Sequence, residues 1–304
     1  MTKERILVTG ARGGLASDLS KQLCDDFEFI GIDPRLRSES HFFGDIIHAH
    51  YRSRKVDDLF RKYKFRAVFH LGRVPVGSEM KDSDRYSENV LGTQHLLNLC
   101  EQHNVPTAIA LSTFHVYGAH PHNPIFLKES DPLRATQRIP QLSDALEFDH
   151  IAAQFGLSSK CKTILLRPTN VVGKNIFNTI SNIFRLHRIP TPLGFDPLMQ
   201  FVHQSDILRA FVAILNNPQS GIYNLAGPGT LPLSQVIALK GAQKIPVPDP
   251  LLKIIINTIP LRSLKIPDYM IDFFKYSSII DSSEFSQKYD FNYSKTLIEA
   301  IADF

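Results

Sequence analysis

A glycine-rich turn near the start of the chain is the feature that most restricts its possible folds. A predicted strand over Arg5–Thr9 runs directly into Gly10, and a predicted helix begins just after Gly13 and Gly14. In such a turn the first glycine permits a sharp change of direction, and the second lets backbone N–H groups approach an anion at the start of the helix. The small Ala16 lets that helix pack closely on the strand. The pattern predicts a parallel α/β sheet with a dinucleotide site.

An acidic residue at the end of the next predicted strand supports that site. The strand covers Phe27–Ile32 and is followed by Asp33. A carboxylate at this place accepts hydrogen bonds from the ribose hydroxyls of adenosine and repels a 2′-phosphate, so it favours NAD over NADP. Arg35 and Arg37 point the other way, because a nearby arginine accommodates that phosphate. NAD is therefore the expected cofactor, with NADP as the alternative.

The rest of the first half alternates strand and helix patterns. This order predicts a Rossmann-like, doubly wound parallel sheet over residues 1–168. After Pro168, short helices, proline-rich turns and an isolated strand over Gly221–Ala226 predict a smaller α/β lobe over residues 169–304, with some segments returning to the sheet. The predicted strands of the first half are Ala67–Leu71, Ala108–Ser112 and Thr163–Arg167, and the predicted helices are Leu15–Cys24, Val56–Tyr63, Tyr86–Gln102 and Gln141–Phe155.

Composition excludes several classes of function. The 304 residues carry a net charge of only +4, without the clustered basic and aromatic residues of a nucleic-acid groove. The three cysteines are far apart, and no His, Cys, Asp or Glu spacing indicates a metal site. The longest apolar run near the C-terminus, residues 251–256, is too short to span a bilayer. No secretory signal precedes the first strand, so a cytoplasmic location is expected.

Eight motifs, in order along the chain, carry a family resemblance. They are Thr9–Ala16, Gly44–Ile46, Val68–Gly72, Asn89–Thr93, Ser112–Gly118, Leu166–Gly173, Phe201–Asp206 and Gly221–Gly227. Together they resemble the extended short-chain dehydrogenase/reductases, and among these the NAD-dependent epimerase/dehydratase family. The resemblance implies that the cofactor is held by Gly10, Arg12, Gly13, Gly14, Leu15, Asp33, Asp45, Ile46, Leu71, Gly72, Asn89 and Pro168. It also implies that Asn170 contacts the substrate, and that homodimers form through the two long helices.

The residues that perform proton transfer in this family are missing. The family uses a Tyr and a Lys four residues apart on one helix, where the ammonium lowers the tyrosine pKa and the tyrosinate takes a substrate proton. Thr113 fills the accompanying Ser/Thr position, but the chain has no tyrosine between Tyr117 and Tyr223. Aligned through the acidic Asp149, the tyrosine position holds Gln141 and the lysine position holds Ala145. A glutamine does not titrate and an alanine carries no charge, so standard catalysis is not expected.

Another side chain near Thr113 could act as the base in place of the missing tyrosine. His115 and Tyr117 would share a face with Thr113 if the strand continued that far. Against this, Tyr117 occupies a position that is normally structural in the family. His70 and His203 also match histidines that the family carries for packing and hydrogen bonding.

The second lobe offers weaker signals. The family's sugar-nucleotide epimerases place an arginine just before the element that Phe201–His203 resembles, and residues 198–200 contain none. The stretch Leu251–Ile280 is apolar and aromatic, as in a helix packed on the lobe or in the entrance to a site for an apolar small molecule.

Three functions are therefore open. The first is an NAD-binding protein that has lost standard catalysis and acts as a dinucleotide-binding or sensor protein. The second is an NAD-dependent epimerase, dehydratase or dehydrogenase that acts on a hydroxyl or carbonyl substrate through an atypical base. The third is a structural or assembly protein that uses no cofactor.

Overall fold

A seven-stranded sheet forms the centre of the larger lobe. The computed structural model describes residues 3–35, 41–76, 78, 80–258 and 267–304. All pairings in the sheet are parallel, and the strand order is β11-β6-β5-β4-β1-β2-β3. The strands are β1 (Glu4–Thr9), β2 (Phe27–Asp33), β3 (Asp45–His48), β4 (Phe65–His70), β5 (Thr107–Leu111), β6 (Lys162–Pro168) and β11 (Gly221–Leu225). The predicted doubly wound α/β fold is confirmed.

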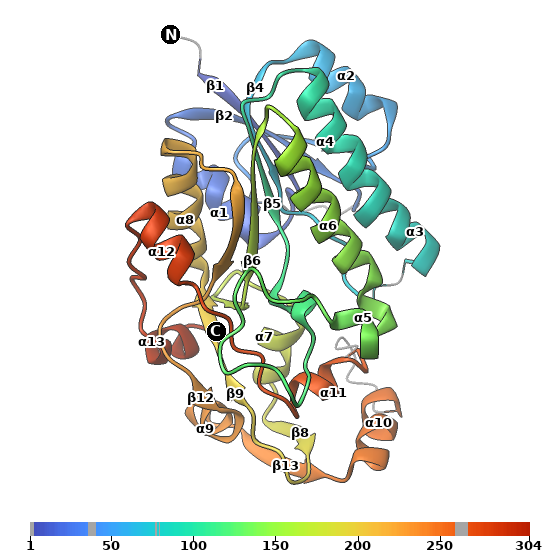
Figure 1. Ribbon diagram of the computed structural model, residues 1–304, viewed down its shortest axis with the longest axis vertical. Coiled ribbons are helices and arrows are strands. Elements are labelled where there is room, and N and C mark those ends of the chain that lie inside the picture. The colour runs from blue at the N-terminus through green and yellow to red at the C-terminus, as the bar shows by residue number, and fades with distance from the viewer. Residues whose placement is uncertain (1–2, 36–40, 77, 79, 259–266) are drawn as a thin grey trace.

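Helices cover both faces of this sheet, as Figure 1 shows. One face carries α1 (Gly14–Leu23), α8 (Gln204–Asn216) and α12 (Ser283–Tyr289), which share an apolar core with the strands. The other carries α2 (Arg54–Lys62), α4 (Gly92–Gln102) and α6 (Ser143–Ser158), which form a second core. Because α8, β11 and α12 come from the second half of the chain, the larger lobe is completed only after the chain has left it and returned.

Two helices differ in detail from their predicted bounds. The predicted helix Tyr86–Gln102 consists of α3 (Asp82–Tyr86), a π-helical turn over Ser87–Leu91, and α4. The helix predicted from Gln141 begins with a short 3₁₀ turn, Pro140–Leu142, before α6 starts at Ser143. Proline suits the first turn of a helix because its nitrogen has no hydrogen to leave unpaired there.

The smaller lobe lies at the carboxyl ends of the sheet strands (Figure 1). It contains three short strand pairs and an apolar core of its own. The pairs are β7 (Asn170–Val172) with β10 (Phe201–His203), β8 (Arg188–Pro192) with β13 (Gln243–Val247), and β9 (Leu198–Met199) with β12 (Leu231–Pro232). Its helices are α7 (Thr179–Phe184), α9 (Leu233–Leu239), α10 (Asp249–Thr258), α11 (Met270–Phe273) and α13 (Leu297–Ala302).

A further apolar cluster joins the two lobes. It contains Phe114 and Tyr117 of a 3₁₀ turn (Phe114–Tyr117), Ala145 of α6, and Phe273 of α11. The short helix α5 (Ala135–Arg138) packs nearby and contributes Ala135. The lobes therefore meet where the strands end, which is where open α/β sheets bind ligands.

Some predictions concern residues outside the described part of the chain, and others concern membrane spans and metal sites. Arg37 and residues 259–266 of the apolar C-terminal stretch lie outside the described part. None of the helices within the described ranges has the length and apolar character that a membrane span requires. Nor do three or more His, Cys, Asp or Glu side chains gather there in a way that would hold a metal ion.

Candidate functional site

The turn between β1 and α1 is built by close backbone contact. Gly10 has a φ of +65°, and a Cβ there would lie 2.5 Å from the Cα of Gly72, just beyond β4. The amide of Gly13 donates to the carbonyl of Gly10 at 2.8 Å and closes the turn. The first turn of α1 has no acidic side chain, and no described side chain caps it at Gly13. The N-terminal amides and the positive end of the helix dipole are therefore available to an anion such as a pyrophosphate.

Asp33 is buried at the end of β2 and accepts four hydrogen bonds. The amide of Arg12 donates at 2.9 Å, the amide of Arg35 donates at 2.9 Å, and the Arg35 side chain donates to both carboxylate oxygens. Burial alone would raise the pKa of Asp33, but the bonds from Arg35 and Arg12 outweigh it and hold the pKa below its usual value. Arg12 and Asp33, both predicted at the cofactor site, are therefore directly linked.

A segment of the smaller lobe lies against the start of α1. A Cβ on Gly14 would lie 2.0 Å from the carbonyl oxygen of Asn175. The side chains of Asn175 and Gln204 each donate to a different oxygen of Asp18, at 3.0 and 3.2 Å. The two lobes are thus tied together beside the glycine-rich turn.

Asn89, predicted to hold the cofactor, makes its hydrogen bonds to protein groups. Its side-chain oxygen accepts from the amide of Val74, and its nitrogen donates to the carbonyl of Val74 and to Asp144. Asn89 is buried and fixes the loop that follows β4. The structure places this loop, including Leu71 and Gly72, beside the glycine-rich turn.

The other predicted cofactor residues lie along the strand ends. Asp45 is exposed and Ile46 half-buried on β3, which pairs with β2 next to Gly31. Leu15 is half-buried in the first turn of α1, and Pro168 is buried at the end of β6. Pro168 and Asp45 belong to opposite halves of the sheet, with the turn between them.

A buried chain of hydrogen bonds connects the centre of the sheet. His70 lies between two threonines, 2.7 Å from the hydroxyl of Thr9 and 2.8 Å from that of Thr93. The Thr9 hydroxyl also accepts from the amide of Gly72 at 3.1 Å. Burial lowers the pKa of His70 to about 3, so its imidazole is neutral at physiological pH. This histidine has a packing role, as the sequence predicted.

The two residues predicted at the positions of the family's catalytic pair, Gln141 and Ala145, have different surroundings. Gln141 is exposed in the 3₁₀ turn, and its backbone carbonyl accepts from Arg85 at 3.3 Å. Ala145 is 3% exposed and packs in the apolar cluster between the lobes. Ala145, the residue predicted at the lysine position, therefore packs among apolar side chains, and neither residue titrates.

Thr113 is paired with His115. The Thr113 hydroxyl lies 2.9 Å from Nδ1 of His115 and also accepts from the His115 amide at 3.3 Å. The strand ends at Leu111, so the expectation that Tyr117 shares their face is wrong. The 3₁₀ turn instead directs Tyr117 into the core, where it donates to Asn224 and accepts from Arg167.

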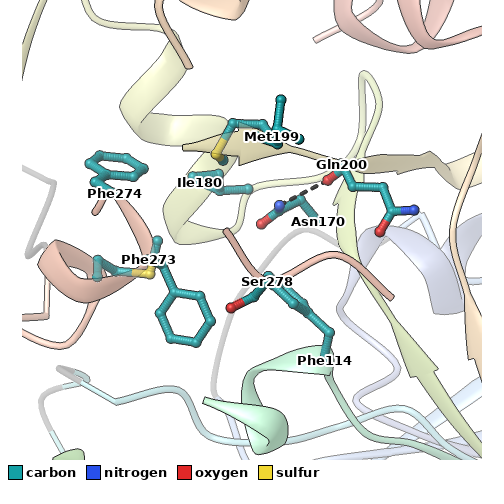
Figure 2. A pocket seen from close by; sticks show the side chains of 10 residues that line it. Phe114, Asn170, Ile180, Met199, Gln200, Phe273, Phe274 and Ser278 are labelled. Carbon is teal, nitrogen blue, oxygen red and sulfur yellow. Dashed lines mark hydrogen bonds between the residues drawn. The ribbon is translucent and has the colours of Figure 1, made fainter. Parts of the chain in front are cut away.

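A pocket between the lobes is mostly apolar (Figure 2). Its walls are Phe114, Ile180, Leu198, Met199, Met270, Phe273 and Phe274, with polar groups from Asn170, Gln200 and Ser278. The amide nitrogen of Asn170 donates to the carbonyl of Gln200 at 2.9 Å. The Gln200 side chain is bonded to the backbone of Ile280. The cavity volume is only about 10 Å³, far below the roughly 300–1,000 Å³ typical of ligand sites, so the lining side chains nearly fill the pocket.

Two residues near Thr113 were missed by the sequence analysis. Arg73 lies three residues beyond the end of β4, and its guanidinium lies over the ring of Phe148 on α6, 6.0 Å from the centroid. Tyr269 precedes α11 and lies edge-on to His115, with 5.7 Å between the ring centroids. An arginine just beyond a strand end was a usable signal for Arg73. No local pattern marks Tyr269, because only the fold brings it to this place.

Comparisons with known proteins agree with this geometry. Residues 6–226 match the model of the NAD dependent epimerase/dehydratase family. The chain is 26% identical over 257 residues to an uncharacterized protein of Mycobacterium tuberculosis, covering 81% of this chain and 67% of that protein. It is 27% identical over 290 residues to a UDP-glucose 4-epimerase of Dictyostelium discoideum, covering 81% and 83%.

Solved structures share the fold at lower identity. MoeE5, in complex with UDP-glucuronic acid and NAD, superposes with a TM-score of 0.76 at 20% identity, covering 98% of this chain and 97% of that one. A dTDP-glucose 4,6-dehydratase of Bacillus anthracis, in complex with NAD, gives a TM-score of 0.77 at 16% identity, covering 99% and 94%.

Proposed function

The chain belongs to the NAD-dependent epimerase/dehydratase family, and from that premise we propose that it binds NAD but has lost the family's standard Tyr/Lys proton transfer. One contrast carries the proposal. The glycine-rich turn and Asp33 are intact, while Gln141 is exposed and Ala145 is buried in an apolar cluster. Because the chain keeps the cofactor-binding residues but lacks the catalytic tyrosine and lysine, a dinucleotide-binding or sensor role follows.

The residues present fit the cofactor. Gly10 and Gly13 shape the turn, the start of α1 presents free amides to the pyrophosphate, and Asp33 would accept from the ribose of adenosine once the Arg35 guanidinium moves aside. When bound, NAD supplies a nicotinamide ring that accepts a hydride. For proton transfer the chain would offer the Thr113 hydroxyl and the His115 imidazole, and α6 carries no tyrosine–lysine pair.

A second function is supported by one specific observation. His115 is held by Thr113 close to the expected reaction centre, so an enzyme with an atypical proton donor or acceptor is the alternative. Burial, with a contribution from Arg73, lowers the pKa of His115 to about 3, so a neutral imidazole is the form present at pH 7. Such a group is a weak base, which favours the first proposal.

Calorimetric titration with NAD, and with NADP as the paired control, tests the proposal. We expect NAD to bind and the bound NAD to stay oxidised, without absorbance at 340 nm, when sugar nucleotides are added. Binding of neither dinucleotide would refute the cofactor proposal. Reduction of bound NAD by any added substrate would refute the loss of catalysis and favour the second function.

A further inference from the structure

A short segment of the smaller lobe, residues 173–176, lies on the first residue of α1. This segment, the strap, follows β7, and the two residues at its tip, Lys174 and Asn175, are exposed. A Cβ on Gly14 would lie 2.0 Å from the carbonyl oxygen of Asn175 and 3.2 Å from its Cβ. Gly14 does not have a positive φ, so a glycine is needed here for the close approach of the strap. The strap therefore contacts the helix end that is available to a pyrophosphate.

Asp18, one turn further along α1, holds the strap in place. Its Oδ1 accepts from the side chain of Asn175 at 3.0 Å, and its Oδ2 accepts from the side chain of Gln204 at 3.2 Å. The side-chain oxygen of Gln204 accepts from the backbone amide of Asn175 at 3.2 Å, so Gln204 presents its NH₂ group to Asp18. The three residues thus form a closed ring of hydrogen bonds, the clasp, between α1, α8 and the strap.

Both ends of the strap are buried, whereas its tip is not. Gly173 is buried, with a φ of +148° and with the side chain of Gln204 in the place of a Cβ. At the other end, Ile176 is 7% exposed. At the tip, Lys174 pairs with Asp303 at 3.4 Å, but 78% of the lysine side chain is exposed. Because an exposed ion pair contributes little to stability, the clasp is the main contact that holds the tip on α1.

The clasp is strong enough to keep the strap closed and exposed enough to open. Hydrogen bonds to a carboxylate are stronger than those between neutral groups, which favours the closed position. Asn175 is exposed and Asp18 is half-buried, so water can replace the bonds between them when the strap lifts. All members of the clasp are protein groups, so the same bonds form whether or not a ligand lies at the start of α1.

We propose that the strap is a gate for the dinucleotide, and that the clasp opens each time the dinucleotide enters or leaves. This inference rests on the proposed function, because it concerns exchange at the same site. A contact that is equally strong in the free and bound protein does not change the equilibrium between them. Weakening the clasp therefore speeds association and dissociation together and leaves the dissociation constant nearly unchanged.

Stopped-flow mixing with NADH, whose fluorescence reports binding, and displacement by excess NAD give both rate constants. In Asp18→Ala we expect each to rise about tenfold, the effect of losing one hydrogen bond to a charged group, and the dissociation constant to change less than about twofold. Asn175→Ala, at an exposed residue, should act in the same direction and serves if Asp18→Ala does not fold. Asp25→Ala, at an exposed carboxylate just beyond α1, is the matched control and should change neither rate.

Hydrogen exchange in the protein without dinucleotide is the second measurement. The amide of Asn175 donates to Gln204 in the clasp, so its exchange should be faster in Asp18→Ala than in the parent or in Asp25→Ala.

The outcomes separate the gate from the cofactor proposal. Faster rates in both directions, or binding by Asp18→Ala when the parent does not bind, would support the gate. Unchanged rates in variants that bind, unchanged exchange at Asn175, or faster dissociation with a matching rise of the dissociation constant would overturn the gate while the cofactor proposal stands. If neither the parent nor the variants bind NADH or NAD, the cofactor proposal fails and the gate fails with it.

Discussion

The guanidinium of Arg35 lies across the carboxylate of Asp33, with Nη2 2.6 Å from Oδ2 and Nε 2.8 Å from Oδ1. This arrangement occupies the acceptor that the ribose of adenosine would use. Asp33 is fully buried, whereas 46% of the Arg35 side chain is exposed, so Arg35 is the partner free to move. The same guanidinium is the natural partner of a 2′-phosphate. Selection between NAD and NADP therefore depends on both residues.

Arg35→Ala should shift selection toward NAD. Removing the guanidinium frees Asp33 for the ribose hydroxyls and removes the partner of a 2′-phosphate. We expect the ratio of NADP to NAD dissociation constants to rise at least about tenfold, equivalent to about 1.4 kcal/mol. Asp33→Ala should lower that ratio. Calorimetry with both dinucleotides measures it, and an unchanged ratio in both variants would contradict this account.

Gly10→Ala should unfold or disable the cofactor turn. The added Cβ would meet the Cα of Gly72 at 2.5 Å, in a backbone that already has φ of +65°. Gly194 is a matched control, because it has φ of +85° but nothing within 4 Å of a Cβ. We expect Gly194→Ala to cost about 1 kcal/mol from backbone strain and Gly10→Ala at least twice that, with loss of NAD binding. Urea unfolding of both variants gives the comparison, and equal costs would refute the steric argument.

The sequence predicted those parts of the fold that depend on local patterns. Neighbouring residues are enough to predict the turn at Gly10, the strand that ends at Asp33, and the lack of a tyrosine and a lysine at positions 141 and 145. The aromatic contacts of His115 do not, because Tyr269 and Phe273 reach it from a distant segment. The early end of β5 at Leu111 was also missed, and it separates Tyr117 from Thr113. Arg35 was noticed in the sequence, but only the fold shows that it covers Asp33.

Asp149→Ala should destabilise the protein strongly. Asp149 is fully buried in a bidentate pair with Arg167, whose pKa is raised by this partner despite the opposing effect of burial. Removing one partner leaves a buried charge, which costs about 3–5 kcal/mol. The double variant Asp149→Leu with Arg167→Met should recover at least half of that loss, because no unpaired charge remains. Urea unfolding measures both, and a double variant less stable than the single one would contradict this reasoning.

Acid should weaken the fold partly through His70. Its pKa falls from 6.5 to about 3 on burial, so between these values the unfolded chain binds a proton that the folded chain does not. Stability is therefore lost as pH falls from about 6.5 toward 3, by up to about 1.4 kcal/mol per pH unit for each such proton. His70→Gln should reduce the slope between pH 6.5 and 4.5. His150→Gln, on the exposed side of α6, should not, and equal slopes in both variants would exclude His70 as a source.

Restoring the family's catalytic pair should fail for a structural reason. Ala145 is 3% exposed among apolar side chains that include Phe114 and Leu142, so Ala145→Lys places an ammonium in a packed apolar cluster. We expect overpacking to lower the free energy of unfolding by about 1–3 kcal/mol, in Ala145→Lys and in the isosteric control Ala145→Met alike. The buried charge should lower it further in Ala145→Lys alone. Adding Gln141→Tyr should not repair it, because position 141 is exposed in the 3₁₀ turn. The double variant is assayed for reduction of bound NAD in the presence of sugar nucleotides, beside its urea unfolding curve. Turnover in a stable double variant would show that α6 still presents both positions to a reaction centre, and that only two side chains separate this protein from an active enzyme.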